Sequence, residues 1–216
     1  MAEIVAIDAD HDTVTSAGSQ HRRQHVYPYL RGKRLQVQVV RAVQAVVEAA
    51  VVRQEVVYLT GEGHGLTNVF YGDNRQAVFV VGSYPPKAVE NKIVHFLSCQ
   101  TADRLGPDFV QNKCSAYFGY DTDFVFPLDE PYLTTFLECD SEIDRGFADG
   151  LTANEVDRRA RAAFTAQAEK LRAANQHYQA EIMEFNRDHL CSPATGSQWG
   201  DPEARLKGAY QPLQAV

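Results

Sequence analysis

Two short apolar segments, each followed closely by a reactive side chain, constrain the fold of this chain most. Residues 56–60 lead to His64, which has a glycine on each side, and residues 93–97 lead through a serine to Cys99. Apolar runs of this length are typical of buried strands in a parallel sheet. Because open α/β sheets place their chemistry at the carboxyl ends of the strands, we expect His64 and Cys99 to share one crevice if the two strands are neighbours.

The rest of the chain alternates strands with helices in one domain spanning residues 1–216. Further strands are predicted at residues 3–7 and 114–119, a hairpin at 68–81, and helices at 35–52 (where a strand remains an alternative), 102–112 and 130–147. Residues 13–34 are polar and are predicted to form a loop with little regular structure. The pattern indicates an α/β fold with a mostly parallel central sheet and helices on both faces.

A long helix is predicted in the region 150–190, followed by a C-terminal tail at residues 191–216. Thr152 and Glu155 form a capping box at its start, and apolar residues recur at steps of three or four to about His189. The helix either packs on the core or docks a partner. A last short helix is predicted at residues 202–207.

Composition excludes several classes of function. The chain has 216 residues and a net charge of −7, with basic residues mainly in small clusters, so no nucleic-acid partner is expected. No segment is long and apolar enough to span a membrane, and no signal peptide is visible. The four cysteines show no CxxC pair and no zinc-like spacing, which indicates a reduced, cytoplasmic protein.

The chemistry that a cysteine and a histidine perform together is nucleophilic catalysis. A thiol becomes a good nucleophile only when it loses its proton, and an imidazole can accept that proton and return it to a leaving group. The backbone N–H groups of Gly65 and Cys99 are natural donors to an oxyanion. Glu62 either orients His64 or is solvated.

The other reactive side chains have simpler interpretations. Cys114 and His95 lie within predicted strands and are expected to be core residues, and Cys139 and Cys191 are expected to be unpaired. An acidic segment follows the first strand and could also be interpreted as a metal site, with His21 and His25 as further ligands. Its spacing, however, is not that of an EF-hand loop. No metal and no cofactor are therefore expected. The residues of that segment are Asp8, Asp10, His11 and Asp12.

The order of these motifs resembles that of caspase-like (clan CD) cysteine peptidases. The shared layout is an apolar block before His64–Gly65 and a second block that ends in Ser98–Cys99. Residues 105–120 and the segment Gly200–Asp201–Pro202, with Arg205–Leu206 after it, resemble the bacterial branches, which include CHAT-domain, gingipain-like and clostripain-like proteins.

The resemblance implies a caspase–haemoglobinase fold, a three-layer sandwich, with a Cys99–His64 dyad that hydrolyses peptide bonds. In several relatives the loop after the first strand reads the P1 side chain of the substrate. Here that loop is acidic, so Asp8 or Asp10 is predicted to favour Arg or Lys at P1 through charge-assisted hydrogen bonds.

Three functions therefore remain open. The first is a cysteine endopeptidase that acts on a protein or peptide, after a basic residue. The second is a caspase-like interaction or regulatory module with little intrinsic turnover, which an activating protein partner would switch on. The third is a non-peptidase thiol hydrolase or acyltransferase that uses the same dyad on small thioesters or amides.

Overall fold

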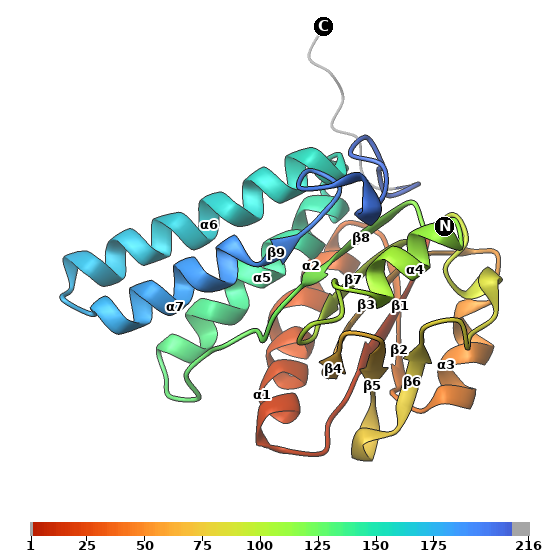
Figure 1. Cartoon of the computed structure of the whole chain (residues 1–216), viewed down its shortest axis with the longest axis horizontal. Coiled ribbons are helices and arrows are strands. Elements are labelled where there is room, and N and C mark those ends of the chain that lie inside the picture. Colours follow the sequence, from red (N-terminus) through yellow and green to blue (C-terminus); the bar gives the residue numbers. More distant parts are fainter. Residues whose placement is uncertain (1, 209–216) are drawn as a thin grey trace, which may run out of the picture.

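Six strands form the central sheet in the computed structural model, which describes residues 2–208 (Figure 1). The strands are β1 (Glu3–Asp8), β2 (Gln36–Arg41), β3 (Val56–Glu62), β7 (Ile93–Leu97), β8 (Ala116–Tyr120) and β9 (Leu190–Cys191). They lie in the order β2–β1–β3–β7–β8–β9; the first five run parallel and β9 pairs antiparallel with β8. The strands that precede His64 and Cys99 are thus neighbours, as their expected chemistry requires.

A second, three-stranded antiparallel sheet follows β3. It consists of β4 (His64–Leu66), β5 (Val69–Tyr71) and β6 (Ala77–Val80), with the short 3₁₀ turn η2 (Asp73–Arg75) before β6. The predicted hairpin is present as β5 and β6. The additional strand β4 pairs His64 with Tyr71, which fixes the backbone of the histidine immediately beyond the central sheet.

Helices cover both faces of the central sheet. Successive side chains of a strand point to opposite faces, so Ile4 and Ala6 of β1 belong to one core while Val5 and Ile7 belong to the other. The first core is closed by α2, α5, α6 and α7, and the second by α3, α4 and the hairpin. The prediction of a mostly parallel α/β sheet with helices on both faces is confirmed, and the layering is consistent with a three-layer sandwich. The helices are α1 (Thr13–His21), the π-helix η1 (Arg22–Val26), α2 (Tyr27–Gly32), α3 (Gln44–Val51), η3 (Pro86–Ala88), α4 (Leu105–Gln111), α5 (Tyr132–Ala148), α6 (Ala153–Ala173), α7 (His177–Asp188) and η4 (Ser197–Trp199).

The prediction of a loop at residues 13–34 is wrong, because this segment forms α1, η1 and α2. The helix α1 buries Thr15, Gly18, Ser19 and His21 rather than a stripe of large apolar side chains. Hydrophobic periodicity, which is the main sequence signal for a helix, is therefore weak here. Its start is instead marked by Asp12, whose carboxylate accepts a hydrogen bond from the Thr15 backbone N–H at 2.9 Å.

The single helix predicted at residues 35–52 is also wrong, since the segment divides into β2 and α3. The alternative of a strand holds for its first half. Three valines in β2 suit a strand, because β-branched side chains lose rotamer freedom in a helix. The alanine-rich second half forms α3, which buries Val47, Ala50 and Val51.

The helix predicted from Thr152 to about His189 is two helices, α6 and α7, which pack against each other (Figure 1). The capping box at Thr152 is present. The break comes at Asn175, which has a left-handed φ of 60°, and the N–H of Gln176 donates to the carbonyl of Leu171 at 2.8 Å. This is a Schellman ending, in which Asn serves where glycine is more usual.

The short helix predicted at residues 202–207 is absent, and this part of the tail packs against the sheet instead. Gly200, with φ 111°, pairs with Ala116 at the start of β8, and the N–H of Asp201 donates to the carbonyl of Ser115 at 2.9 Å. A Cβ at Gly200 would lie 2.5 Å from that carbonyl oxygen, so only glycine fits. The rest of the predicted tail, residues 209–216, lies outside the described residues.

Across residues 2–208, none of the helices has both the length and the apolar character that crossing a bilayer demands.

Candidate active site

Cys99 and His64 line one cleft at the carboxyl ends of β7 and β3. The cleft is shallow, and its walls include Glu62, Ser98 and Phe124. A larger pocket of about 1040 Å³ lies at the opposite end of β3, but its described lining holds no cysteine or histidine. The edge of the sheet that the sequence singled out is therefore the one that carries both the Cys99 and the His64 side chains.

Gly65 brings the two segments into contact. A Cβ built on Gly65 would lie 2.3 Å from the carbonyl oxygen of Cys99 and 2.3 Å from Oγ of Ser98. Such distances are far inside van der Waals contact, so the backbone after His64 lies directly against the backbone that carries the thiol. The peptide groups of Gly65 and Cys99, predicted to hold an oxyanion, are adjacent in the fold.

Asp12 holds the histidine, a role that the sequence did not reveal. His64 Nε2 lies 2.6 Å from Asp12 Oδ2. Burial works against ionisation of this carboxyl, but hydrogen bonds from His64 and Thr15 keep the pKa of Asp12 well below its usual range. Asp12 is thus a carboxylate that accepts a hydrogen bond from the Nε2–H group of His64, so Nδ1 is the ring nitrogen that carries the lone pair.

The resting thiol is protonated. Burial raises the pKa of Cys99, and the Asp123 carboxylate raises it further, although backbone hydrogen bonds from Phe124 act in the opposite direction. Asp123 is itself held by a hydrogen bond from the Gln100 side chain at 2.9 Å. Since only the thiolate is strongly nucleophilic, Cys99 depends on a base at the moment of attack.

Glu62 forms part of the cleft wall rather than a partner of His64. Its side chain is buried, and its Oε2 has no hydrogen-bond partner among the described residues. Burial raises the pKa of Glu62 well above its usual range, so the carboxyl is neutral in the resting protein. The carboxyl packs on Gly18 of α1, where a Cβ would lie 2.4 Å from its Cδ.

The two residues predicted to read a basic P1 side chain have different environments. Asp8 is 4 % exposed and is bonded to Arg22, with Nε 3.1 Å from Oδ1, and to the Tyr27 hydroxyl. Its carboxylate faces the interior and is not presented to a substrate. Asp10 is exposed; it accepts a hydrogen bond from Ser16 at 2.6 Å and forms an ion pair with Arg23 at 3.1 Å.

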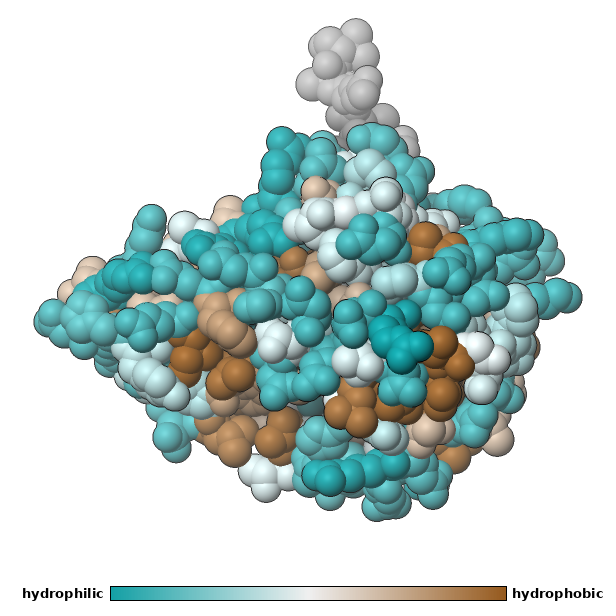
Figure 2. All heavy atoms as spheres, in the orientation of Figure 1, coloured by the Kyte–Doolittle hydropathy of each residue, from teal (hydrophilic) through white to brown (hydrophobic). Residues whose placement is uncertain are grey.

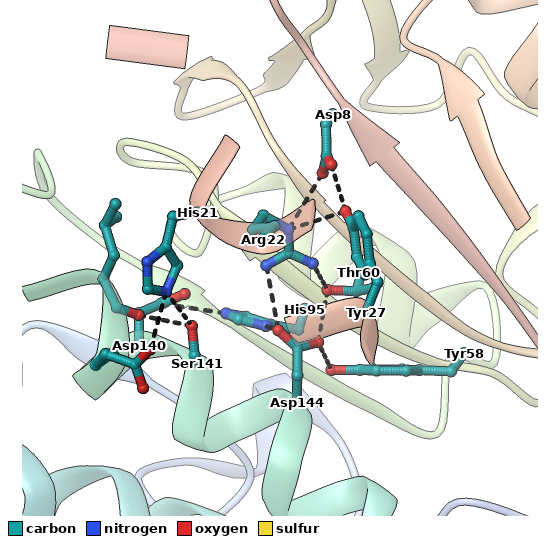
Figure 3. Close-up of polar contacts among 12 residues, drawn as sticks. Asp8, His21, Arg22, Tyr27, Tyr58, Thr60, His95, Asp140, Ser141 and Asp144 are labelled. Carbon is teal, nitrogen blue, oxygen red and sulfur yellow. Dashed lines mark hydrogen bonds and ion pairs between the residues drawn. The ribbon is translucent and has the colours of Figure 1, made fainter. Parts of the chain in front are cut away.

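Asp8 belongs to a buried polar network beneath the sheet (Figure 3). Arg22 also bonds Asp144 of α5 at 3.1 Å, and Asp144 lies 3.3 Å from Nδ1 of His95. His95 Nε2 lies 3.3 Å from Asp140. Burial opposes the charge on His95, but the carboxylates of Asp140 and Asp144 outweigh it and raise the pKa of His95 to about 9. The network ties β1, β3 and β7 to η1 and α5, and so fixes the strand ends that carry the cleft.

The other cysteines are placed as the sequence suggested. Cys114, Cys139 and Cys191 are buried and free, and burial raises the pKa of each of the three thiols to about 12. They are packing residues, and Cys99 is the one cysteine in the described chain that lines the cleft.

Two groups of side chains bring three potential metal ligands together within the described residues. One is His11, Asp12 and His64, at the cleft itself, and the other is His21, His25 and Glu138, away from it. In the first group Asp12 already bonds His64, and the His11 and His64 rings meet edge to face with centroids 5.6 Å apart.

Comparison with known proteins adds no relative: no family model matches the chain, and no curated protein matches it.

Proposed function

We propose that this protein is a cysteine endopeptidase in which Cys99 is the nucleophile and His64 the general base. The observation that carries the proposal is the convergence of three groups at one cleft: the Cys99 thiol, the His64 imidazole and the Asp12 carboxylate 2.6 Å from that imidazole. A nucleophile, a base and a group that orients the base are the parts that acyl transfer requires. The resemblance to caspase-like peptidases supports the same assignment.

The proposed reaction follows from the hydrogen bonds. With Nε2 donating to Asp12, Nδ1 of His64 takes the thiol proton, and the Cys99 sulfur attacks the carbonyl carbon of the peptide. The N–H groups of Gly65 and Cys99 would stabilise the tetrahedral oxyanion. Its collapse breaks the C–N bond as His64 returns the proton to the amine. Water, activated by His64, then hydrolyses the thioester and restores the thiol.

The proposed substrate has a basic residue at P1. Asp8 is not available to it, but Glu62 in the cleft wall has an unpartnered carboxyl oxygen, and Asp10 is exposed on the loop that follows β1. A guanidinium or ammonium group entering the cleft would ionise Glu62 and form a charge-assisted hydrogen bond with it. Recognition would thus replace a neutral buried acid with an ion pair.

A second candidate, a regulatory module activated by a partner, is favoured by the state of the thiol. The segment after β8 places Asp123 and Phe124 next to Cys99, and burial together with the Asp123 carboxylate raises the pKa of the thiol. The same segment exposes Val125 and Leu128. A protein that binds these apolar side chains and draws the segment away would free Cys99 from Asp123.

The test is hydrolysis of a fluorogenic peptide library diversified at P1, by the wild type and by Cys99→Ala. We expect cleavage after Arg or Lys by the wild type and none by the variant. A matched experiment labels Cys99 with an arginyl chloromethyl ketone, and His64→Ala should slow that labelling.

Three other outcomes separate the candidates. Cleavage after uncharged residues would support the Cys99–His64 dyad but would exclude Glu62 and Asp10 as the residues that recognise the P1 side chain. Turnover of small thioesters without peptide cleavage would favour a thiol hydrolase. Labelling of Cys99 only when a partner protein is added would favour the regulatory module.

A further inference from the structure

Three side chains of types that commonly bind metal ions lie close together away from the proposed catalytic cleft. They lie at the junction of α1 and η1, which packs against α5. His21 Nε2 and His25 Nδ1 each lie 3.6 Å from the same oxygen, Oε1 of Glu138. The potential ligand atoms of the three residues all lie within 4.8 Å of one another. This trio is called the His21 cluster below.

The spacing is close to that of a tetrahedral zinc site. Bonds of about 2.0 Å to nitrogen and oxygen place neighbouring ligand atoms about 3.3 Å apart. The two nitrogen-to-oxygen distances in the His21 cluster are 3.6 Å, a few tenths of an ångström longer, and the two nitrogens lie within 4.8 Å of each other. Binding of an ion would require the side chains to move closer together. These two distances are too long for good hydrogen bonds, although they are within ion-pair range when the histidines are protonated.

The backbone brings the two imidazoles together through a π-helix. η1 begins at Arg22, directly after His21, and contains His25. The two rings are stacked, with centroids 4.8 Å apart and an interplanar angle of 26°. π-helical turns are rare and frequently occur at functional sites, where they shift side chains relative to an ordinary helix.

Neighbouring residues orient the ligands. Arg145 binds the other carboxylate oxygen of Glu138, Oε2, at 2.5 Å, which turns Oε1 toward the histidines. An outer contact of this kind is the usual means of fixing the orientation of a metal ligand. Ser141 Oγ lies 3.2 Å from His21 Nε2 and donates its own proton to the carbonyl of Leu137, so in the metal-free protein it accepts a hydrogen bond from Nε2–H. A bound cation would take the place of that proton on Nε2.

The His21 cluster also has an open side. The His21 side chain is 5 % exposed, whereas those of His25 and Glu138 are 44 % and 32 % exposed. A cation can therefore enter from solvent and keep a water molecule as its fourth ligand. Two imidazoles and one carboxylate form a donor set that suits Zn²⁺. It does not suit Mg²⁺ or Ca²⁺, because both ions prefer ligands that are all oxygen atoms.

We propose that His21, His25 and Glu138 bind one Zn²⁺ ion and that the ion clamps the α1–η1 junction to α5. The helix α1 is held at its other end by Asp12, the residue that orients His64. The clamp would therefore fix both ends of the helix that leads from the cleft. The proposal does not depend on the peptidase activity.

The test is zinc binding by the metal-free full-length protein, measured in competition with a chromophoric chelator. We expect one ion per chain, and at least tenfold weaker binding by His25→Ala and by Glu138→Gln. Both side chains are partly exposed, so these variants spare the buried His21. His177→Ala, which removes an exposed histidine from α7, is the matched control and should bind as the wild type does.

Two further readouts complete the test. Zn²⁺ should raise the melting temperature of the wild type and of His177→Ala but not that of His25→Ala, and Co²⁺ should give the intense visible absorption of a four-coordinate site. Absence of zinc binding to the wild type would overturn the proposal. It would also be overturned if binding survived in His25→Ala and was lost in His64→Ala, because the cation would then belong to the cleft.

Discussion

Asp12 makes two contacts that join separate parts of the fold. It caps α1 through the Thr15 backbone N–H, and it bonds Nε2 of His64 across the cleft. The helix start therefore positions the proposed base, and any shift of α1 moves the carboxylate that orients the imidazole. Asp12 thus links α1 to the proposed catalytic histidine.

Replacing Asp12 with asparagine separates the two tasks. Asn is as good an N-cap as Asp, so the free energy of unfolding should change by less than about 1 kcal/mol. The amide cannot stabilise the imidazolium that forms during proton transfer, so kcat/KM for the best peptide should fall by about 10–100-fold. Steady-state hydrolysis and urea unfolding measure the two effects. Undiminished activity in Asp12→Asn would remove Asp12 from the catalytic group.

Substitution of Gly65 is expected to cause a steric clash at the same cleft. A Cβ at this position would lie 2.3 Å from the carbonyl oxygen of Cys99, so Gly65→Ala must push the thiol segment away from His64. We expect a loss of about 1–3 kcal/mol in stability and a disproportionate loss of activity. Urea unfolding and peptide hydrolysis are the measurements. Gly32→Ala is the control, because a Cβ there meets nothing within 4 Å.

At the scale of elements, the α6–α7 break decides the shape of the C-terminal half. The apolar pattern continues through both helices, which is why it predicted one helix. Figure 2 shows a mainly hydrophilic surface over α6, whereas hydrophobic side chains gather in patches lower in the view. Without the turn at Asn175, the apolar residues of α7 would extend into solvent rather than fold back onto α6.

The turn itself gives a prediction about stability. Asn175 has φ 60°, a conformation that costs most L-residues about 1–2 kcal/mol but that Asn and Gly tolerate. Asn175→Ala should therefore lower the free energy of unfolding by about 1 kcal/mol, as measured in urea. Asn175→Gly should match or slightly exceed the wild type. Equal stability of the alanine and glycine variants would contradict this account.

Elements with a large apolar face were predictable, and those with a polar face were not. The strands before His64 and Cys99 could be predicted from the sequence because every second side chain, and often every side chain, is apolar. The helix α1 was missed because it buries small and polar residues against Glu62 and α5. Its partners lie far away in sequence, so no local apolar pattern could reveal it.

The candidate site shows the same division. Cys99 and His64 were found from their position at strand ends, and the structure brings them to one cleft. Asp12 and the burial of Asp8 were not foreseen, since both depend on contacts across the chain, to His64 and to Arg22. A capping position before a polar helix, Asp12-x-x-Thr15, was the one local signal that could have identified Asp12.

At the scale of the whole molecule, the buried network makes stability depend on pH. The pKa of His95 is raised to about 9 in the folded protein and returns to about 6.5 on unfolding. The folded state therefore binds an extra proton between these values. The stabilisation from His95 is complete below pH 6.5 and is lost as the pH rises through 9.

We accordingly expect the free energy of unfolding to fall between pH 6.5 and 9, with a loss on the order of 3 kcal/mol if His95 acts alone. Urea unfolding at half-unit steps measures it. Burial also raises the pKa of Glu62, and this effect has the same sign. The comparison with His95→Gln isolates the histidine: the variant should be less stable at pH 6.5 and should show a flatter curve. Parallel curves for the two proteins would exclude His95 as the source.

The antiparallel pairing of β9 with β8 has a consequence for synthesis on the ribosome. The five parallel strands are complete once Tyr120 has emerged, but the strand that covers the free edge of β8 follows about seventy residues later. Until then the β8 sequence AYFGY presents unpaired N–H and C=O groups on an apolar strand. A nascent chain arrested before Leu190 is therefore a substrate for chaperones or a seed for aggregation, and only the synthesis of Leu190–Cys191 removes that hazard.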